Sequence, residues 1–302
     1  MKEFTFIVNP VAGRGSTAKL IEPLRRKLAD SNVSGDIVCT TREGEATDLA
    51  RAARGTYVVA VGGDGTVNEV ANGLVGSSKV MGVIPSGSGN DFVKMIGVKA
   101  KLDQALHILL GKKIRTIDVG VVECSGGDAP DTSAPGRSYF VNGVGLGFDA
   151  AVAARMREIR YLRGTLVYVA AVFQMLGKFK APEFQIMSNG TQSASKHLLI
   201  AVGNGTCAGG GFYLTPQAVI DDGFFDVCLI DDINIPTILR LMPRVMRGKH
   251  LNAPEAKFLR TTEIIFRGDR NFFVHADGQI VGRNVQEVRV HLLPKALSVI
   301  AA

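Results

Sequence analysis

Three glycine-rich turns in the first 91 residues constrain this chain most, because each directly follows an apolar run typical of a strand. They are Asn9–Gly15 (NPVAGRG), Gly62–Thr66 (GGDGT) and Pro85–Asp91 (PSGSGND). The apolar runs alternate with segments of helical period at 16–29, 46–54, 67–74 and 102–111. This alternation predicts a parallel sheet covered on both faces. The turns then lie at the carboxyl ends of the strands, where such sheets bind ligands.

The same turns indicate a phosphate-binding site. Glycine lets backbone N–H groups approach a phosphate closely, and a helix that starts after the turn adds its positive end. The turns match neither the GxxxxGK[ST] loop of P-loop NTPases nor a Rossmann GxGxxG fingerprint. Instead, Asp64 lies inside one turn, and Asn90 and Asp91 close another. Carboxylates beside phosphates suit Mg²⁺, which takes oxygen ligands.

The second half of the chain is rich in strands. Apolar runs typical of strands lie at 138–147, 183–190, 197–205, 224–231, 263–268, 271–278 and 287–294, and helical stretches lie at 150–176 and 236–246. The segment 125–137 is rich in Gly, Asp, Pro and Ser and predicts a surface loop. We therefore predict an α/β domain at 1–118 and an antiparallel β-sandwich at 119–289. A return of 290–302 to the first domain stays open.

Composition excludes several classes of protein. A length of 302 residues favours two domains. The net charge of +7 is scattered, which excludes a histone-type basic tail. The start lacks the features of a signal peptide, and the most apolar helical stretch, Thr165–Leu176, is too short to span a bilayer. The four cysteines form no CxxC pair, so we expect reduced thiols in the cytoplasm.

The combination NPVAGRG, VGGDGTVNEVANGL and IPSGSGNDF resembles the diacylglycerol kinase catalytic domain. TIDVG, VGNG, GGGFYLTPQAVIDDGFFDV and HADG extend the resemblance over nearly the whole chain, to the soluble bacterial lipid kinases of the DagK/YegS type. These are relatives of sphingosine and ceramide kinases. GGDGT alone would also fit NAD kinases and phosphofructokinase relatives. The resemblance implies an α/β nucleotide domain, a β-sandwich domain and a site in the cleft between them.

The resemblance assigns roles residue by residue. It places the ATP phosphates at Asn9, Gly13, Gly15, Gly63, Asp64, Gly65, Thr66, Val67, Asn68 and Glu69. Thr40 would contact the nucleotide, as would Asn90 and Ser88, which keeps the hydroxyl of the usual Thr. The catalytic Mg²⁺ is assigned to Asp64, Asp91 and Asp118. A second, structural Mg²⁺ is assigned to Asp222 and the backbone carbonyls of Val219 and Phe224. Without the resemblance, each residue also has an interpretation that involves no metal. Asp118 would then lie at a solvated strand end, and Asp222 would belong to an ordinary Asp-Gly turn.

The motif Asp277-Gly278-Gln279 departs from the family's usual DGE. In the family the acidic pair supplies the base that activates the lipid hydroxyl, whereas Gln279 cannot accept a proton at neutral pH. Two interpretations follow. Either Asp277 is the base by itself and Gln279 keeps a hydrogen bond, which we favour, or the protein is slow or inert. His275 is interpreted as a packed strand histidine or as a residue that lines the cleft.

A basic set, Arg240, Arg244, Arg247 and Lys249, lies mainly on a predicted helix. It is either a solvated face or a surface that docks to anionic lipid headgroups. The resemblance implies an ATP- and Mg²⁺-dependent kinase that acts on diacylglycerol or a related lipid, peripherally at the inner membrane face. No nucleic-acid partner is expected, and a homodimer stays open. The alternatives are a kinase of phosphatidylglycerol, a sphingoid base or NAD, and a non-catalytic nucleotide- or lipid-binding protein.

Overall fold

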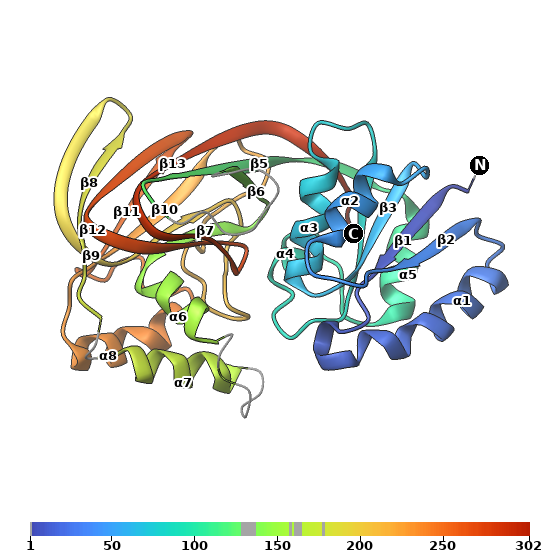
Figure 1. Ribbon diagram of the computed structural model, residues 1–302, viewed down its shortest axis with the longest axis horizontal. Coiled ribbons are helices and arrows are strands. Elements are labelled where there is room, and N and C mark those ends of the chain that lie inside the picture. Colours follow the sequence, from blue (N-terminus) through green and yellow to red (C-terminus); the bar gives the residue numbers. More distant parts are fainter. Residues whose placement is uncertain (1, 128–136, 157–158, 160–164, 177–178) are drawn as a thin grey trace. The chain divides into compact units, whose positions relative to one another are not determined.

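The computed structural model describes residues 2–127, 137–156, 159, 165–176 and 179–302, and it divides into two compact units (Figure 1). Unit 1 comprises residues 1–119 and 294–302, and unit 2 comprises residues 120–293. Most of the surface loop predicted at 125–137 lies outside the described residues.

Unit 1 is an α/β domain built on a parallel sheet. Its strands run in the order β2, β1, β3, β4 and the end of β13 (Gln279–Ile300), and each neighbouring pair is parallel. The strands are β1 (Phe4–Val8), β2 (Gly35–Cys39), β3 (Tyr57–Gly62), β4 (Val80–Pro85) and the beginning of β5 (Ile114–Ser125). The helices are α1 (Ile21–Asp30), α2 (Glu45–Ala52), α3 (Asp64–Leu74), α4 (Asp91–Met95) and α5 (Leu102–Gly111), with 3₁₀ turns at Ala12–Gly15 and Thr17–Leu20.

The central strands of unit 1 are covered on both faces. Every residue of β4, and every residue of β3 after Tyr57, is buried. This explains the continuous apolar runs of the sequence, because a strand between two helical layers has no side that faces water. The last strand of the chain returns to this sheet, where Ser298 pairs with Val80 and Val299 with Met81.

Unit 2 is the β-rich domain. Its strands are the rest of β5, then β6 (Arg137–Phe140), β7 (Gly143–Gly147), β8 (Glu183–Ser188), β9 (Thr191–Gly203), β10 (Phe225–Asp231), β11 (Ala256–Thr261), β12 (Glu263–Ala276) and most of β13 (Gln279–Ile300). The pairings of β5 with β6, and those among β7 to β12, are antiparallel, and so is that of β12 with β13. The β-sandwich fold class predicted for this half is confirmed.

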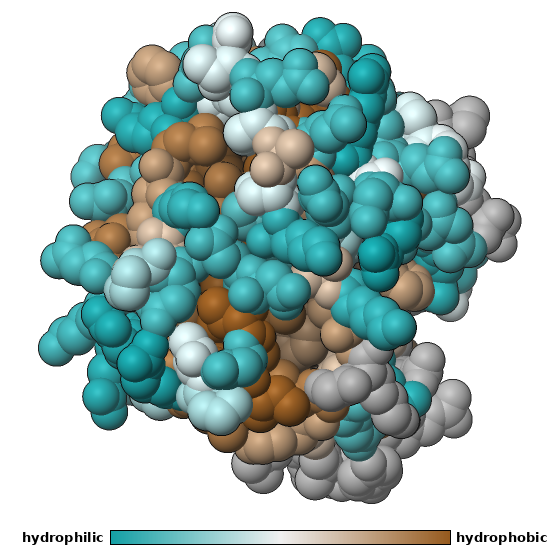
Figure 2. All heavy atoms as spheres, turned by 90° about the vertical axis from the view of Figure 1, so that its left-hand side faces the viewer, coloured by the Kyte–Doolittle hydropathy of each residue, from teal (hydrophilic) through white to brown (hydrophobic). Residues whose placement is uncertain are grey.

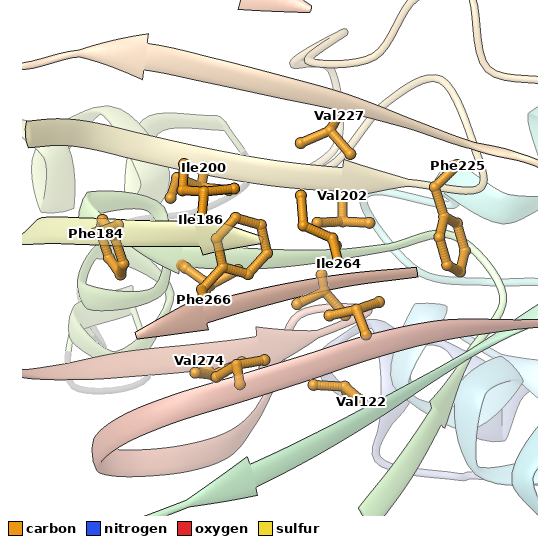
Figure 3. Packing of buried hydrophobic residues seen from close by; sticks show 14 of the residues in the cluster. Val122, Phe184, Ile186, Ile200, Val202, Phe225, Val227, Ile264, Phe266 and Val274 are labelled. Carbon is orange, nitrogen blue, oxygen red and sulfur yellow. The ribbon is translucent and has the colours of Figure 1, made fainter. Parts of the chain in front are cut away.

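The core of unit 2 is built from alternating residues of these strands. Phenylalanine, valine and isoleucine side chains from strands distant in sequence point toward one another, including Phe184, Phe225 and Phe266 (Figure 3). On β9, Ile200 and Val202 join this core. The residue between them, Ala201, faces a second core beneath α6 (Phe148–Met156), α7 (Thr165–Met175) and α8 (Ile235–Val245). From Leu199 to Val202 the period of two thus divides the side chains of β9 between the sandwich and the helices.

Several predicted elements have different boundaries in the structure. The helix predicted at 67–74 already begins at Asp64, so part of the GGDGT motif is helical. The strand predicted at 138–147 is divided into β6 and β7, whereas the runs at 263–268 and 271–278 form one strand, β12. Within the stretch predicted at 150–176, the described residues form helices α6 and α7, and residues 157, 158 and 160–164 lie outside the described residues. Strand β11 has no counterpart among the predicted strands, because its sequence, AKFLRT, carries little apolar alternation.

Candidate active site

The three glycine turns of unit 1 meet at the carboxyl ends of β1, β3 and β4. A Cβ atom on Gly87 would lie 2.6 Å from the Cα of Gly63, so the second and third turns approach backbone to backbone. A Cβ on Gly13 would lie 2.4 Å from the carbonyl oxygen of Ser86, and Gly13 has a left-handed φ of 56°. Glycine is therefore required at these places by the close approach of the turns.

Side-chain hydrogen bonds tie the same turns together. Asn9 Nδ2 donates to Thr66 Oγ1 at 3.2 Å, which joins the first turn to the start of α3. The hydroxyl groups of Thr17 and Ser86 lie 2.6 Å apart and join the first turn to the third. The sequence did not single out Thr17 or Ser86, because small hydroxyl residues beside glycine turns carry no distinctive pattern.

The carboxylate of Asp64 links the second turn to the third. Its two carboxylate oxygens accept hydrogen bonds from the backbone N–H groups of Asn90 (2.8 Å) and Asp91 (2.7 Å). Asn90 has a left-handed φ of 49°, and α4 begins at Asp91 directly after it. Asp64 itself is the first residue of α3. Two helices therefore start beside each other, and the positive ends of helices attract anions.

The remaining residues predicted to bind the nucleotide lie in different settings. Gly65, Val67 and Asn68 belong to the first turns of α3, where Val67 and Asn68 are buried. Gly15 has a left-handed φ and open space beside it, and Ser88 is exposed on the third turn. Thr40 is buried directly after β2, and its N–H donates to the carbonyl of Val8.

Glu69 links two helices of unit 1. Its carboxylate accepts a hydrogen bond from the N–H of Ala46 at 3.2 Å and so joins α3 to the start of α2. This contact gives Glu69 a structural task beside any contact with a nucleotide.

The three acidic residues predicted to hold the catalytic Mg²⁺ lie in two different settings. Asp64 and Asp91 are neighbours, and Asp91 also forms an ion pair with Lys94 at 2.8 Å. Asp118 is fully buried on β5 and accepts a hydrogen bond from the N–H of Lys295 at 2.8 Å. Across the described part of the chain, no group of three or more His, Cys, Asp or Glu residues could hold a metal ion. Asp64 and Asp91 carry carboxylate oxygens, the type of ligand that Mg²⁺ takes, and a Mg²⁺ ion at these residues stays a prediction.

The second predicted metal position, at Asp222 in unit 2, is next to a positive side chain. Arg260 forms ion pairs with Asp222 and, at 3.7 Å, with Asp226. Its guanidinium group also lies 4.7 Å from the centre of the Phe224 ring. Burial raises the pKa of Asp226, while the Arg260 charge acts to lower it. Arg260 thus supplies positive charge to the Asp222 carboxylate, and a metal ion at Asp222 and Val219 stays a prediction.

The Asp277 turn of unit 2 holds its carboxylate in a fixed position. Asp277 follows β12 with a left-handed φ of 47°, so it lies in a turn and not on the strand with His275. Its carboxylate accepts hydrogen bonds from the N–H groups of Val141 (2.9 Å), Asn142 (3.0 Å) and Gly143 (2.8 Å). These are the residues that separate β6 from β7 and begin β7. Gln279 starts β13, opposite Ala276.

Sequence reasoning did not find the partner of His275. The imidazole Nε2 of His275 lies 2.8 Å from the carboxylate of Asp149, and both side chains are buried. The other ring nitrogen accepts a hydrogen bond from the N–H of Gly278, next to Asp277, at 3.4 Å. Asp149 lies in the first turn of α6, 126 residues before His275, so no local pattern connects the two.

Comparisons with known proteins agree with this arrangement. The family model of the diacylglycerol kinase catalytic domain matches residues 3–122, and that of the YegS C-terminal NAD kinase beta sandwich-like domain matches residues 142–301. The chain is 28% identical to a diacylglycerol kinase of Mycobacterium tuberculosis, over 98% of this chain and 94% of that protein. It is 26% identical to a diacylglycerol kinase of Bacillus subtilis, over 93% and 91%.

Solved structures show the same fold. A diacylglycerol kinase structure from Bacillus anthracis superposes with a TM-score of 0.71 at 21% identity, covering all of this chain and 97% of that one. The match to the structure of yeast NADH kinase covers all of this chain and 84% of the yeast chain, with a TM-score of 0.51 at 11% identity.

Proposed function

Because this chain belongs to the lipid kinase family that joins a diacylglycerol kinase catalytic domain to a YegS-type C-terminal domain, we propose that it transfers the γ-phosphate of ATP to the hydroxyl group of diacylglycerol or a closely related lipid. The product with diacylglycerol is phosphatidic acid. The observation that carries the proposal is the meeting of three glycine turns at one edge of a parallel sheet.

The phosphates of ATP bind at these turns. The backbones of Gly63 and Gly87 lie so close that their turns form one surface, and the starts of α3 and α4 add the positive ends of two helices. Phosphoryl transfer depends mainly on positioning and on neutralising charge. The turns serve both needs, and the hydroxyl contact between Thr17 and Ser86 keeps them together.

Asp64 and Asp91 would hold the Mg²⁺ ion that accompanies ATP. Bound there, the ion neutralises phosphate charge and orients the transferred group. The hydrogen bonds from Asn90 and Asp91 fix the direction of the Asp64 carboxylate before any ligand arrives. A contribution of Asp118 remains part of this proposal.

Asp277 accepts the proton of the lipid hydroxyl. Three backbone N–H groups fix the direction of its carboxylate, and a carboxylate held in one orientation can take up the proton of a hydroxyl group placed against it. Gln279 remains a neutral amide beside it. Asp277 thereby carries the role that an acidic pair has in the usual DGE motif.

The described residues form no helix long and apolar enough to cross a membrane. We propose that the protein meets its lipid at the inner face of the cytoplasmic membrane, where ATP is available.

A transfer assay tests the proposal. Radiolabelled ATP and Mg²⁺ with diacylglycerol in mixed micelles should yield labelled phosphatidic acid. Asp277→Asn should lower kcat about 10²- to 10⁴-fold, as expected for the loss of a general base. Asp269→Asn, which changes an exposed carboxylate on β12, is the matched control and should keep full activity.

Other outcomes would point elsewhere. Transfer to phosphatidylglycerol, a sphingoid base or NAD, and not to diacylglycerol, would keep the kinase and change the substrate. ATP binding without transfer to any member of this panel would favour the non-catalytic alternative. Full turnover of Asp277→Asn would rule out Asp277 as the base.

A further inference from the structure

Helix α8 of unit 2 exposes an apolar stripe to solvent. Ile235, Leu239 and Met246 are 42%, 41% and 38% exposed. Their spacing of four and seven residues places them on one side of the helix. The opposite contacts are made by Leu241 and Val245, which are buried in the second core. The stripe therefore lies beside the face by which α8 packs on its own domain, and Met242 is at the boundary between the two.

Positive charge lies next to this stripe. Residues 235–249 contain four basic residues and no acidic one. Arg240 is paired with Glu255, and Arg244 donates to the carbonyl of Lys249. Arg247 and Lys249 are exposed at the end of the helix. The exposed side of α8 thus carries an apolar half and a cationic half.

Helix α7 extends the apolar surface. Its sequence, TLVYVAAVFQM, holds no charged residue, and Phe173 is 54% exposed. Helices α7 and α8 cover the same buried core and lie along the same edge of unit 2 (Figure 1). In the space-filling view of this side, apolar atoms reach the surface in the lower half of the face (Figure 2).

We propose that this surface binds an anionic lipid bilayer. It is defined by Phe173 of α7 and, in the α8 region, by Ile235, Leu239, Met246, Arg247 and Lys249. The apolar residues enter the boundary between headgroups and acyl chains, and the basic residues contact the phosphates. The assignment rests on the proposed function, because a kinase of a bilayer lipid must work at the bilayer.

The composition of the surface favours a membrane over nucleic acid as its partner. Interfaces with nucleic acid are polar and strongly positive, because phosphate contacts dominate them. On a nucleic acid the stripe of Ile235, Leu239 and Met246 would stay in water. A bilayer contacts both kinds of residue at once, because its acyl chains accept the apolar side chains and its headgroup phosphates attract the basic ones.

Vesicle sedimentation tests the assignment. The full chain is mixed with vesicles of phosphatidylglycerol and phosphatidylcholine, or of phosphatidylcholine alone, at low and high salt. Two double variants are compared with the unchanged protein: Ile235→Ser with Leu239→Ser, and Arg247→Gln with Lys249→Gln. The matched controls alter exposed residues of unit 1: Leu110→Ser with Ile114→Ser, and Lys99→Gln with Lys101→Gln.

We expect the basic double variant to bind anionic vesicles about 10- to 30-fold more weakly, since each basic residue contributes roughly fivefold near such a surface. It should lose most of the salt dependence and bind neutral vesicles as before. The apolar double variant should bind both kinds of vesicle more weakly, and the controls should bind like the unchanged protein. Thermal unfolding of each variant verifies that it is folded.

A second readout separates this proposal from the proposed function. In detergent micelles, the surface variants should phosphorylate diacylglycerol at close to the unchanged rate, because no bilayer is needed there. Unaltered vesicle binding by both double variants would overturn the surface assignment and leave the kinase intact. Vesicle binding without any lipid phosphorylation would support the membrane-binding surface and overturn the proposed kinase activity. Binding to duplex DNA in preference to vesicles, lost in the basic double variant, would also overturn the assignment.

Discussion

At the scale of single residues, the absence of a side chain at Gly145 allows a buried contact beside the Asp277 turn. A Cβ at position 145 would lie 2.3 Å from Nε2 of His275 and 2.4 Å from a carboxylate oxygen of Asp149. The imidazole and the carboxylate that meet there are both buried, and the imidazole also receives the N–H of Gly278. Gly145 therefore leaves the space in which His275 supports the turn that carries Asp277.

We expect Gly145→Ala to disrupt this contact. An inserted methyl group in a packed interior typically lowers the free energy of unfolding by about 1–3 kcal/mol, and displacement of His275 should also lower kcat. Urea unfolding and the micelle assay measure the two effects. Gly111→Ala, at the end of α5 where a Cβ meets nothing, should leave both quantities unchanged or raise stability slightly. Equal stability of Gly145→Ala and the unchanged protein would contradict the packing argument.

At the scale of elements, the starts of α3 and α4 act as one unit because the Asp64 carboxylate accepts the first N–H groups of the neighbouring helix. An amide at position 64 is neutral and offers one acceptor oxygen in place of two, so its NH₂ group would take the place of the second acceptor. The order of the third glycine turn and the ligand for Mg²⁺ thus depend on the same side chain.

Asp64→Asn should therefore raise the Mg²⁺ concentration needed for half-maximal transfer by about tenfold or more, since charge-assisted hydrogen bonds and a ligand charge are lost together. The rate of phosphatidic acid formation as a function of Mg²⁺ measures this. Asp103→Asn is the matched control, because Asp103 also lies in the first turn of a helix. Its side chain is largely exposed and pairs with Lys27. A shift of equal size in the control would show that any helix-start carboxylate has this effect.

The sequence predicts these elements well where the signal is local. The strands and glycine turns of unit 1 follow from apolar runs that end in glycine, and the fold class of both halves is confirmed. The division between β6 and β7 does not follow, because Val141 continues the apolar run while the N–H groups of Val141 and Asn142 donate to Asp277. The Arg260–Asp222 and His275–Asp149 pairs join residues far apart in the chain, so only the folded structure reveals them.

At the scale of the whole molecule, stability should depend on pH through two buried histidines of unit 2. Burial lowers the pKa of His197, against the opposing charge of Asp231. Burial also lowers the pKa of His250, whose ring contacts the carbonyl of Leu214. In the unfolded chain both return to about 6.5.

Below that pH the unfolded chain takes up protons that the folded chain does not, so folding stability must fall as the solution becomes more acidic. We expect the thermal midpoint to decrease from pH 7 to pH 5.5, because the free energy of unfolding falls by up to about 1.4 kcal/mol per pH unit for each histidine. His250→Gln should flatten this dependence, whereas His107→Gln, on the exposed side of α5, should not. A midpoint that rises over this interval would contradict the assignment of buried neutral histidines.

The longest strand of the molecule, β13, begins in unit 2 and ends beside β4 in unit 1. A ribosome makes the chain from its N-terminus, so β1 to β4 leave it long before Ser298 and Val299 exist. During all of that time β4 has no neighbour on the side that β13 will occupy. The first unit to be synthesised is thus completed only after unit 2 has been made, because its sheet edge is closed by Ser298 and Val299.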